Sequence, residues 1–338
     1  PMREGLSMRK TRSTIMATFQ IFDLTGAKAD WMYKVANKNN VKDFEAIFVD
    51  DGSTDDSGAF LDELCTSDKR FSVYHHEKNM SLVGARFTGM KHACGDHIVF
   101  LDSDDALTND ALEAIKNAFD DGEPDMIRFG LVMQPQNFEI MPIESDDCLR
   151  DFMELKFPPA IWKNAYSADI IRKTIEVGEP FYCNMGEDSF FSSMFFTFAK
   201  NIKILPKVIY LYDATAGMSQ TSVTSTMTKL VKDYTNIHAS GEHILSFIKK
   251  YNSDYTALAE RAVNNMLRYI LLQNMLYAKD CLDVVEYLEF FKAKGHTSVY
   301  EFGCKVLIPY KVMFDLKRND ERFANLELPD MFKELPEK

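Results

Sequence analysis

The sequence lacks the residue patterns of disulfide-linked, zinc-binding and membrane-spanning proteins. Its six cysteines are scattered without a CxxC pair, which favours buried thiols in a reducing compartment. The seven histidines form no HExxH motif, so a structural zinc site has no support. No apolar run is long enough to cross a bilayer and no segment resembles a signal peptide, so we expect a cytoplasmic protein.

Basic residues are also few relative to acidic ones. The chain has 39 Lys and Arg against 51 Asp and Glu, which gives a formal net charge of -12. Proteins that bind the phosphate backbone of nucleic acids need a basic surface, so we expect no nucleic-acid partner. The 338 residues are more than one compact core usually contains, and they predict one large domain with an extension, or two domains.

Strand-like and helix-like segments alternate along the first part of the chain. Short apolar runs suit buried strands, and apolar residues at three- and four-residue spacing suit helices. This alternation predicts an α/β fold with a Rossmann-like, mostly parallel sheet. The predicted strands are 15–22, 45–49, 71–74, 97–101 and 125–133, and the predicted helices are 30–38, 59–64, 82–93 and 109–119.

The pattern changes after about residue 134. Residues 138–147 suit a loop, 188–199 a buried helix rich in Phe, and 202–212 an extended segment. From about residue 224 onward apolar residues recur at helical spacing. We therefore predict two domains, 1–220 with the sheet and 221–338 as a helical C-terminal region.

Two clusters of carboxylates follow predicted strands. Residues 47–57 read IFVDDGSTDDS, and residues 100–105 read FLDSDD. Because ligands of parallel sheets bind at the carboxyl ends of the strands, both clusters should rise at one edge of the sheet. Mg²⁺ and Mn²⁺ take such oxygen ligands together with phosphate oxygens. Either motif alone is as typical of a solvated loop or a helix cap as it is of a metal site.

The two clusters together are more specific, and the wider pattern resembles a known family. It is similar to the bacterial family-2 glycosyltransferases of GT-A fold, roughly over residues 44–220 and most strongly over 44–106. The segments that carry the resemblance are VDDGSTDDS (49–57), NMSLVGAR (79–86), FLDSDD (100–105), WKNAY (162–166) and GED (186–188).

The resemblance implies where a nucleotide-sugar donor binds. Asp50 and Asp51, with Ser53, would contact the nucleotide base and ribose, and Arg86 would lie on the nucleotide side. In the D-x-D pair, Asp104 would bind Mn²⁺ or Mg²⁺. Its partner Asp102 would serve the ribose, or the metal through water.

The resemblance also implies how the acceptor is activated. Asp188 would be the catalytic base, Asp105 would support the metal-binding pair, and Glu187 and Trp162 are candidates for contacting the acceptor. Burial beside the Phe-rich run that follows would raise the pKa of Asp188 and make it a better base. Two adjacent acids also simply favour a helix N-terminus, and both explanations can hold together.

Two positions depart from the family pattern. Residues 21–24 (IFDL) replace the usual turn against the donor base, which makes the identity of the donor less certain. Asp213 occupies a position where the family often has Arg, either weakening contacts to diphosphate or acceptor or adding a metal ligand.

The expected activity is metal-dependent, inverting transfer of a hexosyl or N-acetylhexosaminyl group, most plausibly from a UDP-sugar. The expected acceptor is a surface glycan, such as capsule, lipopolysaccharide or exopolysaccharide, or a lipid-linked precursor. Residues 305–317 would contact the inner membrane face or dock on the sheet domain, and the C-terminal region would help to form the acceptor site or a homodimer. The alternatives are a non-catalytic binding member and a sugar nucleotidyltransferase, although the latter needs a Gly-rich basic loop where only Gly26 and Lys28 occur.

Overall fold

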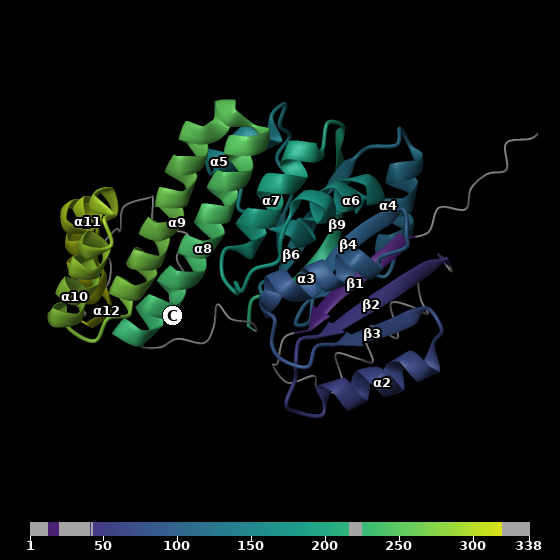
Figure 1. The fold of residues 1–338 in the computed structure, drawn as a ribbon, viewed down its shortest axis with the longest axis horizontal. Coiled ribbons are helices and arrows are strands. Elements are labelled where there is room, and N and C mark those ends of the chain that lie inside the picture. The colour runs from purple at the N-terminus through teal and green to yellow at the C-terminus, as the bar shows by residue number, and fades with distance from the viewer. Residues whose placement is uncertain (1–12, 20–40, 42, 216–224, 320–338) are drawn as a thin grey trace, which may run out of the picture.

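A computed structural model describes residues 13–19, 41, 43–215 and 225–319. The predicted helix 30–38, the turn at 21–24 and the predicted boundary at 220/221 lie outside the described residues. Within them the chain forms a central sheet covered by helices, with a helical C-terminal region extending to one side (Figure 1).

The sheet is mostly parallel, as the strand and helix alternation predicts. Its strand order is β3-β2-β1-β4-β8-β6-β9-β5, and β7 pairs with β6. The first four of these strands are parallel neighbours, whereas β8 runs antiparallel between β4 and β6, and β5 and β7 are antiparallel to their partners. The strands are β1 (Ser13–Phe19), β2 (Phe44–Asp50), β3 (Phe71–His75), β4 (His97–Asp102), β5 (Ala106–Leu107), β6 (Met126–Gln134), β7 (Phe138–Ile140), β8 (Asn164–Ser167) and β9 (Ile202–Asp213).

Helices cover both faces of the sheet because the buried strands present apolar side chains on both sides. In β2, Ile47 and Val49 face one core and Phe48 faces the other, as the two-residue period of a strand requires. One core contains residues of α3, α6 and α7, and the other contains residues of α2 and α4. The helices of this part are α2 (Ser57–Ser67), α3 (Ser81–His92), α4 (Ala111–Asp120), α5 (Cys148–Met153), α6 (Ala168–Val177) and α7 (Glu187–Phe198).

Some elements differ from the sequence prediction. The predicted loop 138–147 begins with β7, which closes a hairpin with β6. The sequence pattern does not predict strand β8 or the helix α6 that follows it. Strand β8 has only four residues and carries little periodic signal. It is nevertheless the link between β4 and β6.

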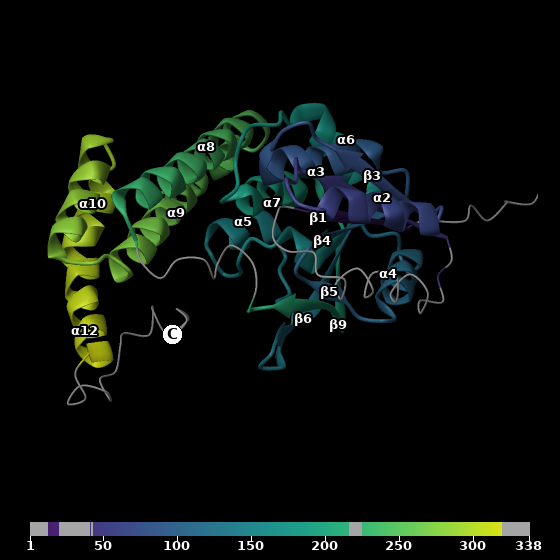
Figure 2. The ribbon, with the colours of Figure 1, turned by 90° about the horizontal axis from the view of Figure 1, so that it is seen from below.

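The C-terminal region begins with two long antiparallel helices that pack on the sheet domain (Figures 1 and 2). Helices α8 (Met227–Tyr251) and α9 (Thr256–Leu276) contribute Phe247 and Ala259 to the core that contains residues of α3, α6 and α7. Elsewhere they join a third core with α10 (Cys281–Ala293), α11 (Thr297–Phe302), the π-helical turn η4 (Gly303–Leu307) and α12 (Ile308–Asn319).

The stretch 305–317 lies within this C-terminal helical core. Leu307 and Tyr310 are buried there, and the ammonium of Lys311 donates to the carbonyl of Leu276 in α9. The expectation that this stretch docks on the sheet domain is therefore wrong. Among the described residues no helix combines the length and apolar character needed to cross a bilayer.

Candidate active site

The two carboxylate clusters meet at one edge of the sheet. Strand β1 pairs with β2 on one side and β4 on the other, and Thr18 is in register with both Val49 and Asp102. Asp50 therefore ends β2 one position beyond the level at which Asp102 ends β4, and Asp51 follows directly. We call this side of the sheet, with residues 50–53 and 102–105, the carboxyl edge.

Two histidines hold the first cluster. The ring of His75 lies 2.8 Å from Asp50 Oδ2, and the ring of His76 lies 2.7 Å from Asp51 Oδ1. Burial would raise the pKa of Asp50, but hydrogen bonds from Ser53 and His75 outweigh it and leave the pKa lowered. The hydrogen bond to Asp50 is the main cause that raises the pKa of His75. Only the pairing of β3 with β2 brings these histidines to the two carboxylates.

The second cluster is a turn with a buried acid beneath it. Asp105 is 7% exposed and accepts hydrogen bonds from the Tyr210 hydroxyl (2.7 Å) and the Asp213 backbone N–H (2.8 Å). Burial, together with the charge of Asp102, raises the pKa of Asp105 to about 8. Asp102 and Asp104 are more open, and the Asp102 side chain is 28% exposed. The turn therefore presents its outer carboxylates and anchors itself through the inner one.

A buried arginine joins this turn to Asp188, the predicted catalytic base. Arg86, on α3, is 2% exposed. Its Nη1 donates to Glu187 Oε1 and to Asp188 Oδ1, both at 3.0 Å, and its Nη2 donates to Asp102 Oδ1 at 3.3 Å. One cation thus holds carboxylates from the end of β4 and from the first turn of α7.

Asp188 has a raised pKa and a partly exposed side chain. Burial is the largest influence on its carboxyl group, and with the negative charges of Glu187 and Asp102 it raises the pKa to about 8 against the opposing effect of Arg86. The side chain keeps 22% of its surface exposed, so a substrate can still reach it. A carboxylate with such a pKa is a stronger proton acceptor near neutral pH than an ordinary aspartate.

Trp162 and Glu187 lie close to the same cluster. The Trp162 ring stacks on Tyr210, whose hydroxyl binds Asp105, with centroids 4.7 Å apart, and on Tyr212 at 5.2 Å. The Glu187 side chain is 10% exposed because Arg86 covers it. Trp162 therefore adjoins the acidic turn, whereas Glu187 mainly neutralises Arg86.

Comparison with known proteins identifies the family. Residues 32–157 match the family described as Glycosyl transferase family 2. This part of the chain is a family-2 glycosyltransferase domain. Two relatives are an uncharacterized glycosyltransferase of Rickettsia felis, 47% identical over 72 residues, and the uncharacterized glycosyltransferase EpsJ of Bacillus subtilis, 27% identical over 188 residues. The matches cover 21% and 52% of this chain, and only 12% and 54% of the two relatives.

A solved structure shows the same fold over most of the chain. The crystal structure of Staphylococcus aureus TarS, residues 1–349, superimposes with a TM-score of 0.57 at 15% sequence identity. The alignment covers 91% of this chain and 87% of the TarS chain, so it includes C-terminal helices. The GT-A fold expected from the motifs is thereby confirmed.

The carboxyl edge has oxygen ligands that could hold a divalent cation. The described residues contain no group of three His, Cys, Asp or Glu side chains arranged around one point for a metal. Mg²⁺ and Mn²⁺ commonly use one or two carboxylates plus phosphate oxygens. Asp102 and Asp104 can supply the carboxylates. Among the described residues, the three carboxyl groups of Asp102, Glu187 and Asp188 share the single guanidinium of Arg86, so acidic groups are in excess there. The donor set and its charge therefore fit such an ion.

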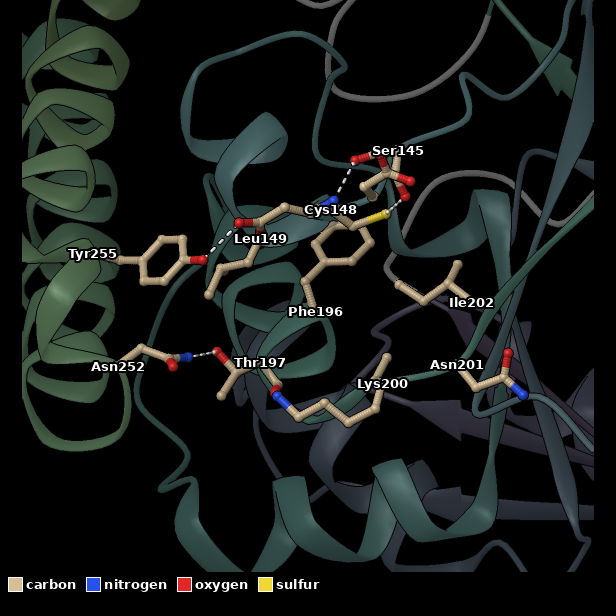
Figure 3. Close-up of a pocket in the computed structure, with 13 residues that line it drawn as sticks. Ser145, Cys148, Leu149, Phe196, Thr197, Lys200, Asn201, Ile202, Asn252 and Tyr255 are labelled. Carbon is tan, nitrogen blue, oxygen red and sulfur yellow. Dashed lines mark hydrogen bonds between the residues drawn. The ribbon is translucent and has the colours of Figure 1, made fainter.

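A separate cavity of about 360 Å³ lies near the opposite edge of the sheet (Figure 3). It is bounded by the end of α7, the start of β9 and the connection between α8 and α9. Tyr255 donates a hydrogen bond to Asp147 Oδ2, and Asn252 donates one to Thr197 Oγ1, across its rim. Ile202 at the cavity is the first residue of β9, whereas Asp213 at the other end of β9 binds Asp105. The cavity is therefore distinct from the carboxyl edge.

Proposed function

We propose that this protein is a metal-dependent, inverting glycosyltransferase that moves a sugar from a nucleotide-sugar to a glycan hydroxyl. The observation that carries the proposal is the buried Arg86, which brings Asp188 next to Asp102 at the carboxyl edge. A base and a site for a diphosphate then lie side by side, as a direct displacement at the sugar requires.

The donor would occupy the edge between the two acidic clusters. Asp51 is fully buried, and its Oδ2 has no hydrogen-bond donor among the described residues. A buried acceptor without a donor is costly, and an N–H group of a nucleotide base would satisfy it. Asp50 and Ser53 would shape the ribose side, with Ser53 N–H donating to Asp50 Oδ1 at 3.0 Å.

The diphosphate would lie beside Asp102 and Asp104. A Mn²⁺ or Mg²⁺ ion held by these carboxylates would neutralise the charge that develops on the leaving diphosphate. Arg86 contributes a fixed positive charge to the same place without itself being exposed. TarS has been solved with UDP and with UDP-GlcNAc, which makes UDP-sugars the first donors to test.

The transfer step then uses Asp188 as general base. The acceptor oxygen forms a bond to the anomeric carbon while the bond from that carbon to the diphosphate oxygen breaks. The proton of the acceptor hydroxyl passes to the Asp188 carboxylate, and the bonding electron pair leaves with the diphosphate. Attack from the face opposite the leaving group inverts the anomeric configuration.

The acceptor would approach from the side of Trp162. Aromatic faces pack against the apolar faces of sugar rings, and Trp162 stands beside the acidic turn. We propose a surface-glycan or lipid-linked acceptor, which would bring the protein to the inner face of the membrane. Glu187 would act there mainly by fixing Arg86.

Two substitutions test this proposal. Asp188→Asn should lower turnover by about 10²–10⁴-fold while nucleotide binding is retained, because only the base is lost. Asp104→Ala should lose both turnover and metal-dependent nucleotide binding. Asp169→Asn and Asp121→Ala are matched controls, since these side chains are 66% and 86% exposed at other places on the surface.

The measurements are sugar transfer and donor hydrolysis with and without Mn²⁺, together with calorimetric titration of UDP-, GDP-, CDP- and dTDP-sugars. Equal nucleotide affinity of wild type and Asp104→Ala in Mn²⁺ would contradict the metal role. Nucleotide binding without any transfer or hydrolysis would instead favour a non-catalytic binding protein.

A further inference from the structure

The turn that leads into α7 is held on one side by α3. Ser81 Oγ accepts the backbone N–H of Cys183 at 2.9 Å, and Leu82 N–H donates to Asn184 Oδ1 at 2.9 Å. Helix α3 also carries Arg86. The turn formed by residues 183–186, which we call the α7 turn, is therefore attached to the same helix whose arginine binds Asp188.

On its other side the α7 turn is held by the C-terminal region. Asn236 Oδ1, on α8, accepts the backbone N–H of Asn184 at 2.7 Å. One helical turn further along, the Ser240 hydroxyl donates to the carbonyl of Gly186 at 2.6 Å. Asn236 is 8% exposed and Ser240 is fully buried, so the α8 side of both bonds is shielded from water.

The bonded carbonyl is the one from which α7 starts. Gly186 is the N-cap of α7 and has no side chain for capping, and its carbonyl also accepts the N–H of Phe190 at 3.2 Å. Its φ of 86° is one that L residues rarely adopt, and a Cβ there would lie 2.9 Å from Ile237 Cδ1. Two residues after Gly186, Asp188 takes its position from this start.

We propose that Asn236 and Ser240 are positioning residues for Asp188, so that the C-terminal helical region completes the catalytic site. The inference rests on the proposed function for its kinetic consequences. The α7 turn lies between α3 and α8, and the distance between Arg86 and Asp188 depends on both attachments. A catalytic base displaced by about 1 Å loses much of its effect, whereas donor binding at the carboxyl edge does not involve α8.

Ser240→Ala and Asn236→Ala test the inference. Ser240→Ala removes only a hydroxyl from a helix, where Ala is well tolerated. Each variant should lower kcat by roughly 10- to 100-fold while the donor KM and the nucleotide affinity stay at wild-type values.

Two matched controls separate positioning from general packing. Ser193→Ala removes an equally buried hydroxyl that donates to a carbonyl inside α7, and Asn252→Ala removes a contact from the end of α8 to the other end of α7. Both controls should keep kcat near wild type. Equal kcat losses in controls and test variants, or no loss in the test variants, would overturn the inference.

Hydrogen exchange gives a readout that does not depend on activity. Peptides covering 183–192 should exchange faster in Ser240→Ala and Asn236→Ala than in wild type, and Asn252→Ala should leave them unchanged. Unchanged exchange in the two test variants would refute the positioning role even if the wild type transferred no sugar. Failure of transfer in the wild type, with the expected exchange pattern, would instead refute only the proposed function.

Discussion

Replacing Arg86 with methionine is the most direct test of how the carboxyl edge is held together. Met keeps most of the buried volume but removes the cation that Asp102, Glu187 and Asp188 share. Removing one partner of a buried ion pair typically costs about 3–5 kcal/mol, because the remaining charge stays buried without compensation. Asp102 and Asp188 keep 28% and 22% of their surface exposed, so we expect a loss near the lower end, about 3 kcal/mol.

This loss should depend on pH with a definite sign. Without Arg86 the pKa of Asp188 should rise above its value of about 8, because the group that lowered it is gone. A raised folded-state pKa of an acid makes the folded form less stable as pH rises above the unfolded value, which is 3.8 here. The difference in unfolding free energy between wild type and Arg86→Met should therefore be larger at pH 8 than at pH 5.

The assays are urea unfolding and thermal unfolding in EDTA at the two pH values, both monitored by circular dichroism. With roughly 2.1 cal/mol/K of unfolding entropy per residue, 3 kcal/mol corresponds to a fall in Tm of about 4 °C for this chain. Arg172→Met is the control, because Arg172 pairs with Asp169 at the surface, where their side chains are 71% and 66% exposed, and should contribute about 1 kcal/mol or less. An Arg86→Met protein as stable as wild type would refute this account of charge compensation. The same loss of unfolding free energy at both pH values would refute it too.

Two further substitutions test local features. His75→Gln should lose under about 1 kcal/mol, because His75 is 40% exposed. Since Asp50 raises the pKa of His75, the loss should be present at pH 6 and fade by pH 9 in urea titrations, and a constant difference would exclude the ion pair. Gly186→Ala should cost more than Gly122→Ala, because both glycines have positive φ but only at Gly186 would a Cβ meet α8, at Ile237. Equal unfolding free energies for the two alanine variants would show that this contact is not restrictive.

Much of the fold could be predicted because it depends on local periodicity. Continuous apolar runs at 45–49 and 97–101 indicated buried parallel strands, and β2 and β4 occupy those positions. The short strands β5 and β8 were missed, since two or four residues carry too little pattern to be distinguished from a loop. Their places in the sheet depend on the strands beside them.

Within the site, the sequence by itself determined which carboxylates gather at one edge. Parallel strands end on the same side, so acids that directly follow two such strands must approach each other whatever surrounds them. The N-terminal position of Glu187 and Asp188 on α7 was likewise readable from adjacent residues. Family motifs added the roles of these residues but not their contacts.

Only the tertiary structure decided how those acids are held and tuned. Arg86 meets Asp188 across 102 positions of sequence, and Asn184 meets Asn236 across 52. Such contacts depend on how α3, α7 and α8 pack over the sheet, and no local period records that packing. The pKa of Asp188 depends in the same way on burial and on neighbouring charges, both of which exist only after the chain has folded.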